Sequence, residues 1–238
     1  MASPSLILKK FTHKIEMKNI ELLVLDMAGT TIDEDNVVYK TLTSAVNDYG
    51  YPVSLEKVLS SCAGMEKLEA ITSLLKEING KEEDAPAIFE KFSEQLKESY
   101  KNLDVKPING TEDFLLSMKS QNKKIVLNTG YTSEIAHQLL NKLNWKENVH
   151  FDALITADDV SESRPSPEMI YLAMKKFNIT EANKVLKAGD SVIDIEEGKN
   201  AGCGLTVAVL SGAQGKSELE KAAPDYILNT ISEATGIL

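Results

Sequence analysis

Short runs of apolar residues recur along the 238-residue chain, separated by stretches in which apolar positions repeat at helical spacing. Each run is bounded by a turn residue, a carboxylate or a helix start signal, which is typical of buried parallel strands. The runs are Ile20–Leu25, Lys124–Leu127, Ala153–Thr156, Val185–Ala188, Leu205–Leu210 and Tyr226–Leu228. This alternation predicts an α/β fold, with a Rossmann-like parallel sheet as its core and helices on both faces.

One stretch breaks the alternation, because from about Val38 to Val105 only helical patterns occur. Two apolar helix faces are predicted there, one formed by Leu68, Ile71, Leu74, Leu75 and Ile78 and one by Phe89, Phe92, Leu96 and Tyr100. We therefore predict a small all-helical domain, residues 37–106, inserted into an α/β core of residues 19–36 and 107–238, after an N-terminal tail of residues 1–18. The crossings near Asn36 and near Lys106–Pro107 would form a paired linker. The insert would then lie over the carboxyl ends of the strands, where ligands bind in such sheets.

Helix start signals support this division of the core. Thr111 is a candidate N-cap, with Glu112 and Asp113 in the first turn behind it. Pro165 and Pro167 mark the start of another helix. A further helical pattern covers residues 132–143.

Composition narrows the function classes. Apolar residues make up 42% of the chain, enough for an ordinary core, and the formal net charge of −10 argues against a nucleic-acid binder. No apolar run approaches the roughly 20 residues that cross a membrane, and the apolar stretch near the start is too short for a secretory signal. Two cysteines and three histidines form no disulfide or zinc pattern. We expect a cytoplasmic protein without nucleic-acid or membrane partners.

Polar residues follow the predicted strands at their carboxyl ends. Asp26 ends the first, Thr129 and Gly130 follow the second, and Asp190 follows the fourth, with Asp194 four residues later. Carboxylates suit Mg²⁺, and a hydroxyl with backbone amides suits a phosphoryl oxygen. Arg164, in the segment S-R-P-S-P, would neutralise a second oxygen, and an aspartate held there can attack phosphorus. Each residue alone is more often a helix cap or a solvated side chain, so it is the set that favours a site.

The pattern D-x-A-G-T-T, N-T-G-Y, R-P-x-P and G-D-S-x-x-D resembles the haloacid dehalogenase superfamily, from about residue 20 to residue 230. It is most similar to the phosphonoacetaldehyde hydrolase (phosphonatase) branch, in which a small helical cap domain is inserted at the same place. The resemblance implies that Asp26 is the nucleophile and a Mg²⁺ ligand, that the Ala28 carbonyl and Asp190 are further ligands, and that Asp194 supports them. The residues implied around the phosphoryl group are Ala28, Gly29, Thr129, Gly130, Tyr131 and Arg164.

Ala28 is unusual for the superfamily as a whole. Most of its phosphatases carry an aspartate there, which protonates the leaving alkoxide, and an alanine cannot do this. In phosphonoacetaldehyde hydrolases a cap lysine instead forms a Schiff base with the aldehyde, so that the carbon leaves as an enamine. Lys67, in the stretch G-M-E-K, matches that lysine. The neighbouring family histidine and methionine are replaced here by Ala70 and Ala63.

Three hypotheses follow. The first is a Mg²⁺-dependent hydrolase that cleaves the carbon–phosphorus bond of phosphonoacetaldehyde or a related phosphonate, with Asp26, Lys67 and Arg164 as its catalytic residues. The second is a phosphomonoesterase of the same fold, in which Lys67 is a solvated or anion-binding side chain. The third is a weakly active binder of a phosphorylated ligand. The resemblance also makes a homodimer plausible.

Overall fold

The computed structural model describes residues 19–238, so the predicted tail lies outside the described part of the chain. Six parallel strands form one sheet in the order β5-β4-β1-β6-β7-β8. They are β1 (Leu22–Asp26), β4 (Lys124–Asn128), β5 (Ala153–Ile155), β6 (Val185–Gly189), β7 (Leu205–Val209) and β8 (Tyr226–Leu228). All six predicted strands are confirmed, with some ends moved by one or two residues.

Alternate residues of the central strand β1 serve the two faces of the sheet. Leu23 and Leu25 belong to the large core cluster with α5 (Thr111–Ser120) and α6 (Ser133–Lys142). Leu22 and Val24 belong to the cluster with α7 (Glu168–Lys176) and the end of α8 (Val192–Ala201). The shorter elements are α9 (Lys216–Leu219) and the 3-10 turns Glu82–Asp84, Ala157–Asp159, Ala182–Lys184, Glu220–Ala222 and Ile231–Gly236. The predicted α/β core with helices on both faces is thus confirmed.

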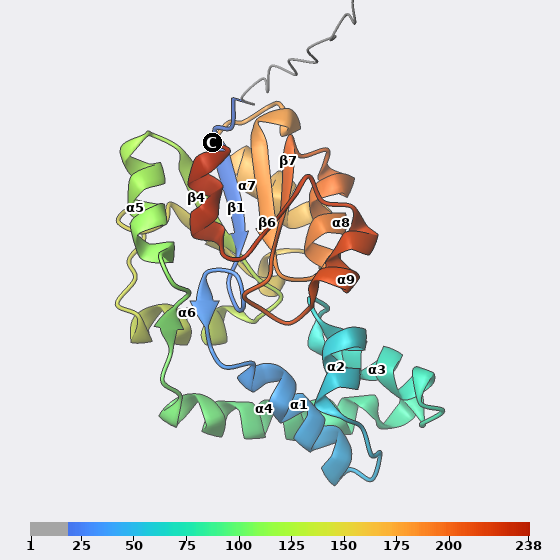
Figure 1. The fold of residues 1–238 in the computed structure, drawn as a ribbon. Helices are drawn as coiled ribbons and strands as arrows, with labels where there is room; N and C mark the ends of the chain where they lie inside the picture. The colour runs from blue at the N-terminus through green and yellow to red at the C-terminus, as the bar shows by residue number, and fades with distance from the viewer. Residues whose placement is uncertain (1–18) are drawn as a thin grey trace, which may run out of the picture.

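A helical insert separates two short antiparallel strands, β2 (Ile32–Asp33) and β3 (Lys106–Pro107), in which Ile32 pairs with Pro107. It consists of α1 (Val37–Asp48), α2 (Leu55–Cys62), α3 (Lys67–Glu77) and α4 (Ala85–Asn102). In Figure 1 the insert, coloured blue to green, lies on the side to which the β1 arrow points. The paired linker and the all-helical insert over the strand ends are confirmed, whereas the exact domain limits stay a prediction.

Two sequence predictions about helices are wrong. Gly110, in the left-handed region, precedes α5 as its N-cap, so Thr111 is the first helical residue and its buried hydroxyl makes no hydrogen bond within residues 19–238. Leu68 is 37% exposed, because the buried face of α3 is Lys67, Ala70, Ile71, Leu74 and Leu75. The inward position predicted for a leucine is therefore taken by a lysine, one residue earlier.

The topology places the end of β1 at a switch point. From β1 the chain adds β4 and then β5 on one side and returns to add β6 on the other. Open parallel sheets bind ligands at such a reversal of strand order, at the carboxyl ends of the strands. Within the described chain, no helix combines the length and the apolarity needed to traverse a lipid bilayer.

Candidate active site

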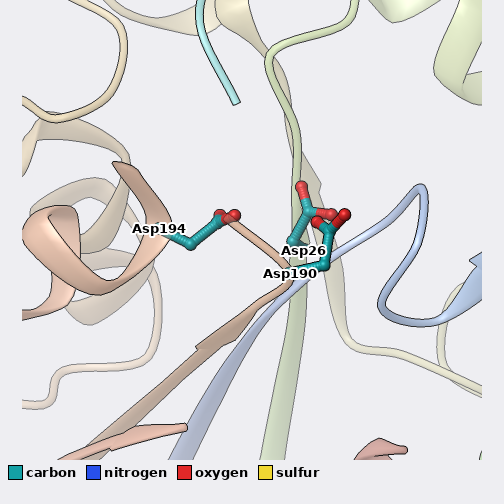
Figure 2. Close-up of side chains that lie close together, drawn as sticks. All are labelled: Asp26, Asp190 and Asp194. Carbon is teal, nitrogen blue, oxygen red and sulfur yellow. The ribbon is translucent and has the colours of Figure 1, made fainter. Parts of the chain in front are cut away.

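Three buried carboxyl groups converge at this switch point. Asp26 is the last residue of β1, Asp190 follows β6 directly, and Asp194 lies in the first turn of α8. One oxygen from each of the three lies within 4.8 Å of those of the other two. Figure 2 shows the Asp26 and Asp190 groups side by side, with the Asp194 group pointing toward them. Asp194 also completes a capping box with Ser191, and the Ser191 hydroxyl donates to Asp194 Oδ2 at 2.5 Å.

Arg164 joins two of these carboxylates. Its Nη1 lies 2.8 Å from Asp26 Oδ1 and 2.8 Å from Asp194 Oδ1, and its Nη2 donates to the Asn128 carbonyl at 2.8 Å. The side chain is only 3% exposed, so the simpler interpretation of Arg164 as a solvated residue does not hold.

Sequence reasoning missed the buried polar network behind this arginine. Lys187, fully buried in the middle of β6, lies 3.0 Å from Asp194 and 3.0 Å from Glu197 of α8. Its Nζ also donates to Asn128 Oδ1 at 2.8 Å, and Asn128 Nδ2 donates to Glu197. The sequence signal that could have revealed this network is Lys187 itself, a lysine inside the apolar run Val185–Ala188. The network holds Asp194 and Arg164 in place beneath Asp26.

The charges in this cluster do not balance. Arg164 and Lys187 face the carboxylates of Glu197 and the aspartate trio, all of them buried. Burial, opposed by the charges of Arg164 and Lys187, raises the pKa of Asp26 to about 6. Burial and the charges of Asp26 and Asp194 raise the pKa of Asp190 well above its usual range.

Of these four carboxylates, Asp190 is the one that has no cationic partner among residues 19–238. Its Oδ2 accepts a hydrogen bond from the Ala213 amide at 2.5 Å. A buried carboxylate next to two others is costly unless a cation compensates it. Oxygen ligands in this arrangement suit Mg²⁺, and two surplus negative charges match its charge. The residues present therefore fit the metal that the sequence implies.

Gly29 allows the loop after β1 to approach Asp190. Its φ of +83° lies in the left-handed region, and a Cβ there would stand 2.5 Å from Asp190 Oδ2 and 2.8 Å from Gly212 Cα. The Gly29 carbonyl accepts a hydrogen bond from Ser211 at 2.7 Å. Gly29 thus packs against the acidic cluster. The loop of residues 211–214, which sequence reasoning did not include, contacts both Gly29 and Asp190.

The residues after β4 offer donors to the same space. The Thr129 amide is already bonded to the Ile155 carbonyl, but its hydroxyl oxygen accepts from the Tyr131 amide and keeps its own proton to donate. Gly130 lies against the insert, since a Cβ there would come 3.6 Å from the Gly64 carbonyl. Tyr131 is buried, and its ring centroid is 6.0 Å from the Lys67 ammonium nitrogen.

Lys67 begins α3 and points into the molecule, with only 7% of the residue exposed. Its Nζ donates to the Met65 carbonyl at 2.5 Å and lies 5.4 Å from the centroid of the Tyr39 ring. Burial lowers its pKa, the charge of Arg164 acts in the same direction, and the thiol of Cys62 opposes the change. The interpretation of Lys67 as a solvated lysine is therefore excluded by its position.

One small cavity, of about 20 Å³, brings these residues together across the boundary between insert and core. Its lining is Asp26, Ala28, Tyr39, Gly64, Lys67, Thr129, Gly130, Tyr131, Arg164 and Asp190. All the predicted site residues except Gly29 and Asp194 belong to this lining. A cavity of this size holds about one water molecule, so this arrangement leaves no room for a substrate.

Glu34 is a further ionisable group that sequence reasoning missed, because it stands in the acidic run D-E-D of the linker. It is buried, and its Oε2 has no hydrogen-bond partner within the described residues. Burial, reinforced by the charge of Asp190, raises its pKa to about 8.

Comparisons with known proteins agree with this geometry. The family model described as haloacid dehalogenase-like hydrolase matches residues 23–208. A phosphonoacetaldehyde hydrolase of Latilactobacillus sakei is 29% identical over 267 aligned positions, covering 93% of this chain and 96% of that protein. One from Bordetella pertussis is 25% identical, covering 92% and 91%. The crystal structure of a phosphonoacetaldehyde hydrolase like protein from Oleispira antarctica superposes with a TM-score of 0.79 at 22% identity, covering 93% and 92%.

Proposed function

Because this chain belongs to the haloacid dehalogenase-like hydrolases, we propose that it is a Mg²⁺-dependent enzyme that cleaves the carbon–phosphorus bond of phosphonoacetaldehyde or a related phosphonate. The observation that carries the proposal is Lys67, a buried amine with a lowered pKa that lines the same cavity as Asp26. Ala28, where an acid would serve an ester leaving group, points in the same direction. The hydrolases from Latilactobacillus sakei and Bordetella pertussis support the substrate class.

The first chemical step belongs to Lys67. Its neutral amine attacks the carbonyl carbon of the substrate, and loss of water leaves a protonated imine. Desolvation supplies the neutral amine, because burial disfavours the ammonium form. The imine nitrogen is then positioned to accept the electrons of the carbon–phosphorus bond.

The second step belongs to Asp26. Its carboxylate attacks phosphorus, the carbon–phosphorus electrons move to the imine nitrogen, and the carbon leaves as an enamine. Arg164, the Thr129 hydroxyl and the Gly130 amide would hold the phosphoryl oxygens. Protonation and hydrolysis of the enamine release acetaldehyde and free Lys67, and a second water molecule hydrolyses the aspartyl-phosphate to inorganic phosphate.

Mg²⁺ would be held by Asp26, Asp190 and the Ala28 carbonyl, and it would neutralise charge between the carboxylates and the phosphoryl group. Asp194 would act through Arg164, whose guanidinium it pairs with. The helical insert would serve as a cap that opens about the β2–β3 linker, since the cavity of about 20 Å³ is too small for a phosphonate.

The test is phosphate release from phosphonoacetaldehyde in the presence of Mg²⁺, with a panel of phosphate esters beside it. We expect the wild type and Lys76→Ala, a matched change at an exposed lysine of the same helix, to release phosphate and acetaldehyde. Lys67→Ala should release neither. Ester turnover without aldehyde turnover, unaffected by Lys67→Ala, would overturn the proposal.

A phosphomonoesterase is the alternative, and one observation favours it. The Met65 carbonyl and the faces of two tyrosine rings surround Lys67, and all three stabilise an ammonium ion. A charged Lys67 would bind a substrate anion and form no imine. Ala28→Asp separates the two, because restoring a positioned acid should raise ester turnover by about 10²–10⁴-fold in a phosphomonoesterase and leave carbon–phosphorus cleavage without benefit.

A further inference from the structure

A second cavity adjoins the reaction site and has no part in the chemistry above. It measures about 240 Å³ and lies between α4 of the insert, the start of α3 and the segment that leads from β4 into α6. Its wall is mainly apolar and includes Val38, Phe89, Phe92, Leu96 and Ile135.

Two oppositely charged residues of this second cavity stand at its outer edge. Lys97 of α4 and Glu134 of α6 pair across the boundary between insert and core, with Nζ 3.9 Å from Oε2 and both side chains more than 60% exposed. This ion pair therefore marks the outer rim, and most of the remaining lining, apart from Lys67, is hydrocarbon and aromatic surface. Such a lining selects an apolar group.

The two cavities are continuous in their lining, because Lys67, Gly130 and Tyr131 belong to both. Asp26, Thr129 and Arg164 line only the small cavity, and the apolar side chains of α4 and α6 line only the second one. A substrate whose carbonyl carbon reaches Lys67 would therefore direct any substituent on that carbon away from phosphorus and into the apolar cavity.

Size decides against a two-carbon substrate as the best fit. The aldehyde carbon of phosphonoacetaldehyde carries only hydrogen there and would leave the second cavity empty. A cavity of 150 Å³ with a similar lining accommodates benzene, so 240 Å³ has room for a six-membered ring or a chain of several carbons.

We propose that the preferred substrate is a 2-oxoalkylphosphonate, R–CO–CH₂–PO₃²⁻, whose group R is a medium alkyl chain or a phenyl ring seated in this cavity. This inference rests on the proposed carbon–phosphorus cleavage and specifies its substrate. The reaction consumes one water molecule overall and gives the methyl ketone R–CO–CH₃ and inorganic phosphate. Lys67 and Asp26 keep the roles given above.

The test is kcat/KM for a series in which R is hydrogen, methyl, propyl, pentyl or phenyl. Each methylene added beyond methyl should raise kcat/KM about fourfold until the cavity is full, because that is the contribution of one buried methylene. Ile135→Trp, which fills the cavity, should abolish this gain and leave the value for R = hydrogen within a few-fold of wild type. Leu116→Trp, at an exposed leucine of α5, is the control and should keep the gain.

The outcomes separate the two proposals. Turnover of phosphonoacetaldehyde with a flat or falling series would overturn the substrate inference and leave carbon–phosphorus cleavage standing. No turnover of any member would overturn both. If Ile135→Trp melts early, Phe89→Ala supplies the second variant, since a larger cavity should shift the optimum to longer chains, and an unchanged optimum would contradict the inference.

Discussion

Replacing Lys187 with methionine tests the buried network beneath the site. Lys187 is fully buried and lies 2.8–3.0 Å from Asn128, Asp194 and Glu197. Methionine is similar in length and fills the space, so the change removes the charge and leaves two buried carboxylates without that partner. Breaking a buried ion pair on one side costs about 3–5 kcal/mol. For a chain of this size that corresponds to a fall in Tm of about 6–20 °C.

The assay is thermal and urea unfolding followed by circular dichroism, with EDTA present so that bound metal does not contribute. Lys184→Met is the matched control. Lys184 is partly exposed and pairs with Glu21 and Glu181, so its loss should cost about 0–1 kcal/mol.

A double variant isolates the charge term in the same assay. Glu197→Gln removes one of the stranded negative charges, and in the Lys187→Met background it should restore about 0.5–3 kcal/mol. If Lys187→Met costs no more than Lys184→Met, or if Glu197→Gln adds a further loss of its own in that background, the reasoning about the network is refuted.

Three further predictions concern groups around the acidic cluster. Asp190→Asn should raise Tm in EDTA, because it removes an uncompensated buried charge. It should also lose the stabilisation by Mg²⁺, about 2.7 kcal/mol, that is expected for wild type at a Mg²⁺ concentration of 100 times Kd. Thermal melts with and without Mg²⁺ measure both effects, and a variant that is still stabilised by Mg²⁺ would contradict the metal assignment. Gly29→Ala should lose about 1–3 kcal/mol more stability than Gly50→Ala in urea unfolding, because both residues have positive φ but only a Cβ on Gly29 would clash, with Asp190. Equal losses would refute this. Glu34→Gln should gain stability relative to wild type as the pH rises from 4.5 toward 8, by up to about 1.4 kcal/mol per pH unit. The reason is that the pKa of Glu34 is raised to about 8 in the folded state, so wild type loses the stability of the protonated form across that window. Melts at a series of pH values, with Glu56→Gln as the control, measure the difference, and a difference that does not change with pH would be the contrary result.

The sequence predicted the sheet well because its strands are buried on both faces. A strand such as Leu22–Asp26 then consists almost wholly of apolar residues, and its end is marked by a carboxylate. The motifs placed Asp26, Thr129, Arg164 and Asp190 around one point because all of them follow or face the carboxyl ends of adjacent strands. The switch in strand order brings those ends together.

The parts that could not be predicted depend on partners distant in the chain. Lys187 and Glu197 are buried only because each faces the other across β6 and α8, and neither has a local signal that identifies its partner. Glu34 stands between two acidic neighbours on a linker, a context typical of solvated residues. Leu68 was expected on the buried face of its helix, but Lys67 takes that inward position, where two aromatic rings and a backbone carbonyl contact its ammonium group.

The most direct measurement of the central claim is reductive trapping at Lys67. Asp26→Asn protein would be incubated with phosphonoacetaldehyde and Mg²⁺, reduced with borohydride and mapped by peptide mass spectrometry. This variant lacks the nucleophile, so the imine should accumulate instead of reacting further. The account predicts a covalent adduct on Lys67 alone among the lysines of α3, absent in the Asp26→Asn, Lys67→Ala double variant. An unmodified Lys67, or an adduct shared equally with the exposed Lys76, would contradict it.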